Sequence, residues 1–98
     1  EYWQTPPGFL PEVAQWLRTT FSKIRFFGFD LISLSSYAHR KIGREAHHAF
    51  LDGNSPVLII EDMDLSSLSQ MEGINNLLIS PFFIDHADGA PCTVWGNV

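Results

Sequence analysis

Two side chains of this 98-residue sequence combine residue types and positions that suit metal binding. His47 stands late in a predicted helix, and Glu61 directly follows the apolar run Val57 to Ile60. A neutral imidazole and a carboxylate are suitable ligands for zinc or manganese, and in open α/β sheets ligands bind at the carboxyl ends of strands. Catalytic zinc takes three protein ligands, so this pair would be an incomplete site. The ordinary alternative is a half-buried helix residue and an acid solvated in a loop.

The neighbouring His48 leaves a choice of ligand open. Adjacent helical residues point about 100° apart, so only one of the two histidines can face a given crevice. Ordinary structural roles are favoured for the remaining chemistry-bearing residues: solvated side chains for His39 and His86, turn capping for Asp30, and a small strand residue rather than a nucleophile for Cys92.

Two helices and two strands would position these residues. An extended lead-in over residues 1–10, with paired prolines and aromatic residues, is expected to dock on the fold. Apolar residues at helical spacing predict a helix over residues 11–22, and Ser35 or Ser36 can cap a second helix that ends near Leu51. Residues 24–30 and 57–60 read as buried strands, which we expect to pair in parallel through a right-handed crossover.

The last third of the sequence predicts two further strands, over residues 75–84 and 92–98. They can pair as a hairpin, with Pro81 interrupting the first strand. The expected fold is therefore α/β, with a small mixed sheet and two helices in a single domain over residues 1–98.

Composition narrows the classes of function. The net charge of −5 comes from eleven acids and six scattered bases, which argues against nucleic acid as a partner. No apolar run approaches the roughly 20 residues that span a bilayer, so no membrane association is expected. The single cysteine, Cys92, suits a reducing compartment, and we expect a cytoplasmic protein. A chain of this length buries only about 60 to 65% of its unfolded surface, so its aromatic residues call for further cover.

Three blocks of the sequence carry a resemblance to a known family. They read FGFDLISLSS, GREAHHAFLDGNSPVLIIEDMDLSSL and LLISPFFIDHADGAPCTVWG. Their order and character resemble the C-terminal half of the cyclase family, which includes bacterial kynurenine formamidases and has a swivelling β/β/α fold. The family's Ala-His on a helix, its Ile-Ile-Glu strand end and its closing turn are matched by Ala46 with His47, by Ile59 with Ile60 and Glu61, and by residues 88–91.

The resemblance implies a metal-dependent hydrolase that acts on an amide or cyclic amide, with His47 and Glu61 as ligands of zinc or manganese. The family's His-x-Gly-Thr-His-x-Asp-x-Pro signature does not occur in this sequence. We therefore expect the other ligands and the proton-transfer group on a missing N-terminal segment or companion chain, the chain alone to be inactive, and the intact protein to be a homo-oligomer. The competing hypothesis is a non-catalytic interaction or regulatory module that docks through exposed aromatic residues such as Trp3 and Trp16.

Overall fold

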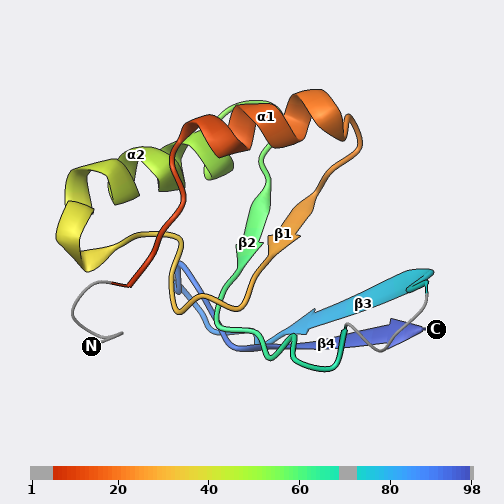
Figure 1. Ribbon diagram of the computed structural model, residues 1–98. Coiled ribbons are helices and arrows are strands. Elements are labelled where there is room, and N and C mark those ends of the chain that lie inside the picture. The colour runs from red at the N-terminus through yellow and green to blue at the C-terminus, as the bar shows by residue number, and fades with distance from the viewer. Residues whose placement is uncertain (1–5, 69–72, 98) are drawn as a thin grey trace. The chain divides into compact units, whose positions relative to one another are not determined.

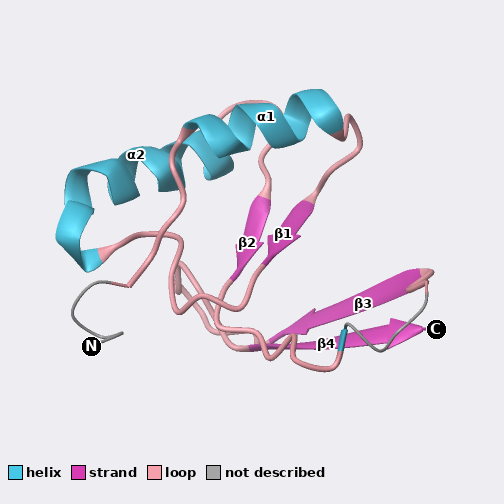
Figure 2. Ribbon diagram, viewed as in Figure 1, coloured by secondary structure: helices cyan, strands magenta, loops and turns pink. Residues whose placement is uncertain are grey.

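The computed structural model describes residues 6–68 and 73–97 (Figure 1). The described residues form two α-helices, a short 3-10 helix and four β-strands, which confirms the predicted α/β character (Figure 2). The chain divides into two compact units, residues 1–65 and 66–98, which are considered separately below. In chain order the elements are α1 (Glu12–Thr20), β1 (Phe26–Gly28), η1 (Tyr37–His39), α2 (Arg40–Leu51), β2 (Leu58–Ile60), β3 (Asn76–Pro81) and β4 (Cys92–Asn97).

The first unit is a parallel strand pair with two helices packed on one of its faces. β1 and β2 pair in parallel, as predicted, with Phe27 opposite Ile59 in the middle of the register. Phe27 and Ile59 pack against the core, and the Phe27 ring stacks on that of Phe50 from α2, with centroids 5.5 Å apart. The core itself is small and draws on both α-helices and on the connections, including the residue after β1 and the residue before β2: Ala14, Leu17, Phe29, Leu34, Ala46, Phe50 and Val57.

The other face of this strand pair is open, so the prediction of two buried strands is only half right. Phe26 and Leu58, which are partners in the register, are 45% and 48% exposed. Successive strand residues point to opposite faces, and only the face toward the helices is covered in the described residues. The continuous apolar run in the sequence cannot show which of its two faces lacks cover.

Arg18 joins the two helices by binding the end of α2. Its Nη1 and Nη2 donate to the carbonyl oxygens of Ala49 and Phe50 at 2.7 and 2.9 Å, and its Nε donates to that of Ser55 at 2.9 Å. The last carbonyls of a helix have no partner within the helix and carry its negative partial charge. A guanidinium therefore satisfies two of these acceptors and neutralises their charge at the same time.

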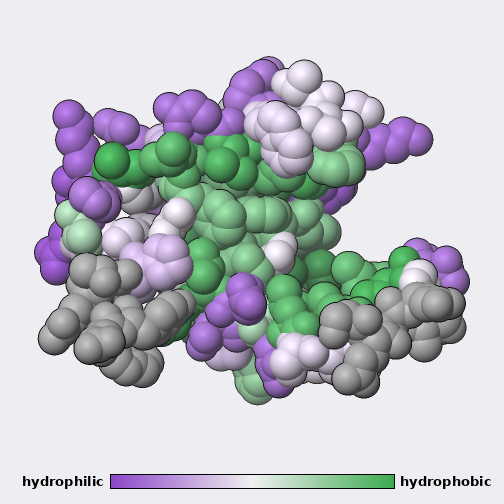
Figure 3. Space-filling view, viewed as in Figure 1, coloured by the Kyte–Doolittle hydropathy of each residue, from purple (hydrophilic) through white to green (hydrophobic). Residues whose placement is uncertain are grey.

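The second unit is the hairpin β3–β4, and it contains no buried residue among those described. Its strands pair antiparallel from Asn76 opposite Asn97 to Pro81 opposite Cys92, so Pro81 ends β3 rather than interrupting it. Large apolar side chains remain exposed, and Figure 3 shows hydrophobic surface along these strands. Those that are more than half exposed are Leu77, Leu78, Phe82, Phe83, Ile84 and Trp95.

The four strands therefore form two separate two-stranded sheets, and the prediction of one mixed sheet is wrong. The first pair is only three residues long on each side, and loop backbone continues its hydrogen bonds. The amide of Asp62 donates to the carbonyl of Leu31 at 2.8 Å, and that of Met63 donates to the carbonyl of Phe29 at 3.1 Å. Each hairpin strand meanwhile uses the other as its partner.

Candidate functional site

The loop of residues 33–36, called here the serine loop, lies between β1 and α2 and is held on one side by the chain's lead-in. The amide of Phe9 donates to the carbonyl oxygen of Leu34 at 2.9 Å. A Cβ atom added to Gly8 would lie 2.8 Å from the Ser36 nitrogen and 2.9 Å from the Leu34 oxygen, so only glycine permits this approach. The predicted docking of the lead-in is therefore seen at residues 8 and 9, whereas Tyr2 and Trp3 lie outside the described residues.

A second glycine holds the serine loop from the side of α2. Gly43 is buried within the helix, and a Cβ atom there would lie 2.3 Å from the Cβ of Ser35. Glycine inside a helix costs about 1 kcal/mol relative to alanine. The close packing of helix against loop explains why α2 contains one at this position.

His47 follows Gly43 by one helical turn and its ring contacts the serine loop. The ring Nδ1 lies 2.9 Å from the carbonyl oxygen of Gly43. Because a carbonyl only accepts, Nδ1 carries the proton, and its other neighbour, Ser35 Oγ at 3.3 Å, acts as an acceptor. This tautomer leaves the lone pair of Nε2 available, which is how a second hydrogen bond orients a metal-binding histidine.

Glu61 reaches the same loop from the carboxyl end of β2. Its Oε2 accepts a hydrogen bond from the backbone amide of Leu34 at 2.5 Å. The side chain is exposed rather than buried, and Oε1 has no donor among the described residues. His47 and Glu61, which are 14 positions apart in the sequence, therefore contact the consecutive loop residues Ser35 and Leu34.

His48 is engaged elsewhere. Its Nδ1 donates to Asp52 Oδ2 at 2.7 Å, and the two side chains are 73% and 67% exposed. The structure thus places the two adjacent histidines in different surroundings, as the helical angle requires.

The donor types fit a divalent cation, but their number is small. An imidazole nitrogen and a carboxylate oxygen are suitable for zinc or manganese. Within residues 6–68 and 73–97, no group of three His, Cys, Asp or Glu side chains is placed to hold a metal ion. Any site built on His47 and Glu61 needs donors from outside these residues.

The remaining predicted residues stand apart from this loop. His39 is exposed at the start of α2, and His86 is exposed beside Asp85, with its Nε2 3.6 Å from the carboxylate. Asp30 is exposed after β1, and Cys92 is half-buried in β4. None of them shares a hydrogen bond with His47 or Glu61 among the described residues.

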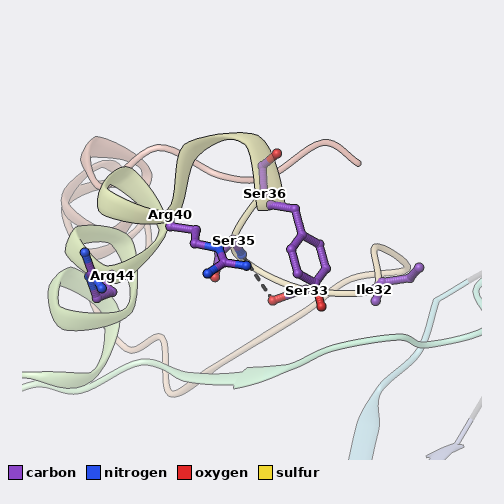
Figure 4. A pocket seen from close by; sticks show the side chains of 7 residues that line it. Ile32, Ser33, Ser35, Ser36, Arg40 and Arg44 are labelled. Atoms are coloured by element: carbon purple, nitrogen blue, oxygen red, sulfur yellow. Dashed lines mark hydrogen bonds between the residues drawn. The ribbon is translucent and has the colours of Figure 1, made fainter. Parts of the chain in front are cut away.

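A cavity of about 330 Å³ lies between the serine loop and the start of α2, and sequence analysis missed it. Figure 4 shows Arg40 extending from α2 toward the loop, with Arg44 one helical turn further along. Treating the bases as scattered hid this pair, although their spacing of four within a predicted helix was the available signal. The cavity is lined by Ile32, Ser33, Ser35, Ser36, Tyr37, Arg40 and Arg44.

The arrangement brings two candidate ligands and a cavity with two arginines to the same short loop. Comparisons with protein families, curated proteins and solved structures give no match. The resemblance to the cyclase family therefore stays a prediction that depends on the three sequence blocks. Among the described residues, no helix has the length and apolar character to cross a membrane.

Proposed function

We propose that this chain is the C-terminal portion of a metal-dependent amide hydrolase that resembles the cyclases and kynurenine formamidases. The observation that supports the proposal most directly is the convergence of His47 and Glu61 on neighbouring residues of the serine loop. These two residues are the ones that the resemblance marks as ligands.

In this proposal the chain's own groups hold and orient two donors. His47 would bind zinc or manganese through Nε2, while Gly43 and Ser35 fix its ring through Nδ1. Glu61 would bind through Oε1, while the Leu34 amide holds Oε2. These two residues would hold a cation whose chemistry, activation of water and polarisation of a substrate carbonyl, suits amide hydrolysis.

The rest of the catalytic site belongs to a missing N-terminal segment or companion chain. Catalytic zinc needs a third protein ligand, and amide hydrolysis needs a group that moves a proton to the leaving nitrogen. We further propose a homo-oligomer in the cytoplasm that acts on a small-molecule amide. The 98-residue chain alone is expected to have no formamidase activity.

The test compares His47→Ala, Glu61→Ala and His48→Ala in the complete protein. The first two are expected to lose bound metal and hydrolysis together, because each removes a ligand. His48→Ala is the matched control, since it deletes the same side chain one position away, where the ring pairs with Asp52. Metal content by mass spectrometry and formamide hydrolysis are the readouts. A His47→Ala protein that keeps its full metal content would refute the assignment.

The hairpin supports a second candidate function, that of a non-catalytic interaction module. Phe83 is 98% exposed, and Phe82 and Trp95 are more than half exposed. An isolated two-stranded hairpin is marginally stable at best, and exposed apolar patches mark interaction surfaces. Reading the gene upstream of the codon for Glu1 separates the candidates: a histidine-rich block there favours the hydrolase, and none in the whole gene favours the module.

A further inference from the structure

The cavity beside the serine loop carries two guanidinium groups that no acid neutralises among the described residues. Arg40 contacts the Tyr37 ring, with its Cζ 5.8 Å from the ring centroid. Neither Arg40 nor Arg44 has an ion pair or a side-chain hydrogen bond within residues 6–68 and 73–97. Their five-donor forks therefore remain available to a ligand.

The charges stand where the helix does not favour them. The start of a helix carries positive partial charge and stabilises acids, yet the first turn of α2 has no acid and begins Arg40–Lys41. Arg40 and Arg44 are also four positions apart, a spacing at which like charges repel. Residues that are locally unfavourable for the fold are expected at functional sites. Here a bound anion would offset both the cations at the start of the helix and the repulsion between Arg40 and Arg44.

The serine loop supplies the rest of the lining in a fixed position. Ser33 Oγ accepts from the Ser35 amide at 3.2 Å, and Ser36 Oγ accepts from the Ala38 amide at 3.3 Å. Gly8 and Gly43 confine the loop from two sides. Hydroxyl groups held in this way can donate to an oxyanion without a large loss of side-chain freedom.

We propose that this cavity binds a small organic oxyanion, a carboxylate or a phosphate joined to an apolar group. Guanidinium forks match the geometry of both oxyanions. Ile32 and the Tyr37 ring provide apolar surface next to them. A volume of about 330 Å³ lies at the lower end of the range for small-molecule pockets.

Ser35 connects this cavity with the candidate metal ligand. Its side chain lines the cavity and its Oγ lies 3.3 Å from His47 Nδ1. Under the proposed hydrolase function, the oxyanion would be part of the substrate or product. The binding itself needs no metal, so it can be tested separately.

The test is an NMR titration of the ¹⁵N-labelled 98-residue chain in metal-free buffer of constant ionic strength. The probes are benzoate, phenyl phosphate, inorganic phosphate and neutral benzamide. Benzoate or phenyl phosphate is expected to shift the amides of residues 33–36 and 40–44 saturably, with benzamide at least about tenfold weaker. The tighter of the two anions identifies the oxyanion as carboxylate or phosphate.

The variants decide whether the arginines form the site. Arg40→Gln and Arg44→Gln are each expected to weaken binding about tenfold, with helicity unchanged by circular dichroism. Lys41→Gln removes the same charge from the same helical turn outside the cavity, and it is expected to change affinity less than about twofold.

Three results would overturn the proposal. They are equal weakening by Lys41→Gln and Arg44→Gln, equal binding of benzamide and benzoate, and the absence of saturable shifts from either organic anion. The two proposals can fail separately. If the 98-residue chain binds the anion saturably while the His47→Ala variant of the complete protein keeps its metal, the oxyanion site is supported and the proposed hydrolase is refuted.

Discussion

The contact between α2 and the serine loop predicts that Gly43→Ala destabilises the first unit, although alanine is the better helix former. Helix propensity alone would stabilise the variant by about 1 kcal/mol. Against this, the new Cβ would lie 2.3 Å from the Cβ of Ser35, 3.0 Å from its Oγ and 3.2 Å from its Cα. Overpacking of this kind costs about 1 to 3 kcal/mol. The loop cannot retreat freely, because Gly8 lies against its backbone at Leu34 and Ser36.

We therefore expect Gly43→Ala to lower the free energy of unfolding by up to about 2 kcal/mol in the natural sequence. In a Ser35→Gly background the conflicting Cβ and Oγ are gone, and the same substitution is expected to become neutral or stabilising by up to about 1 kcal/mol. The coupling energy between the two positions is thus about 2 kcal/mol, within the range for contacting residues. A Ser35→Ala background keeps the Cβ and should keep the destabilisation.

Urea unfolding of the four proteins, followed by far-ultraviolet circular dichroism, measures this cycle. Helical signal is suitable because both α-helices of the described residues belong to the first unit. The reasoning is refuted if Gly43→Ala stabilises the natural sequence, or if its effect is the same with serine and glycine at position 35. Either result would mean that helix and loop are not in the described contact.

Other contacts give further predictions. Arg18→Met removes three hydrogen bonds and a cation at the end of α2, and we expect it to lower the free energy of unfolding in urea by about 2 to 3 kcal/mol. Arg25 is exposed and has no side-chain hydrogen bond among the described residues, so the control Arg25→Met should change this free energy by less than about 0.5 kcal/mol. Ser36→Ala removes the cap of η1 and should cost about 1 kcal/mol by the same measurement. Phe83→Ser should leave stability unchanged, since the ring is 98% exposed, but should reduce concentration-dependent association in analytical ultracentrifugation; equal sedimentation of both proteins would contradict an apolar docking surface.

The spacing of apolar residues predicted the helices and strands well, because it depends only on which face of each single element is buried. The helices expected over residues 11–22 and up to Leu51 occur as α1 and α2, and the strands expected at 24–30 and 57–60 pair in parallel. The boundaries differ by a few residues. Thr20 ends α1 because Phe21 leaves the helical conformation while its amide still donates to Leu17.

Contacts between distant segments were beyond the same reasoning. Nothing in the residue types shows that Gly8 and Gly43 both pack against the serine loop. Nor do they show that Arg18 donates to backbone carbonyls more than 30 positions away. The pairing of strands into two sheets likewise depends on which edges meet, a property of the folded chain. His47 and Glu61 were singled out by their residue types and by their positions late in a helix and at the end of a strand. Their ligand role comes from the resemblance and stays a prediction.

The lead-in has a consequence for how this protein is shortened or tagged. Residues 6–10 look like a dispensable proline-rich segment. Gly8 and Phe9 nevertheless contact the backbone of the serine loop, whose Ser35 contacts the His47 ring. A truncated chain that starts at the first helix would lose this contact and also the Phe9 ring, which packs against the core beside Phe27 and Phe29. Trimming this segment would therefore weaken the core and also remove a support of the loop that His47 and Glu61 contact.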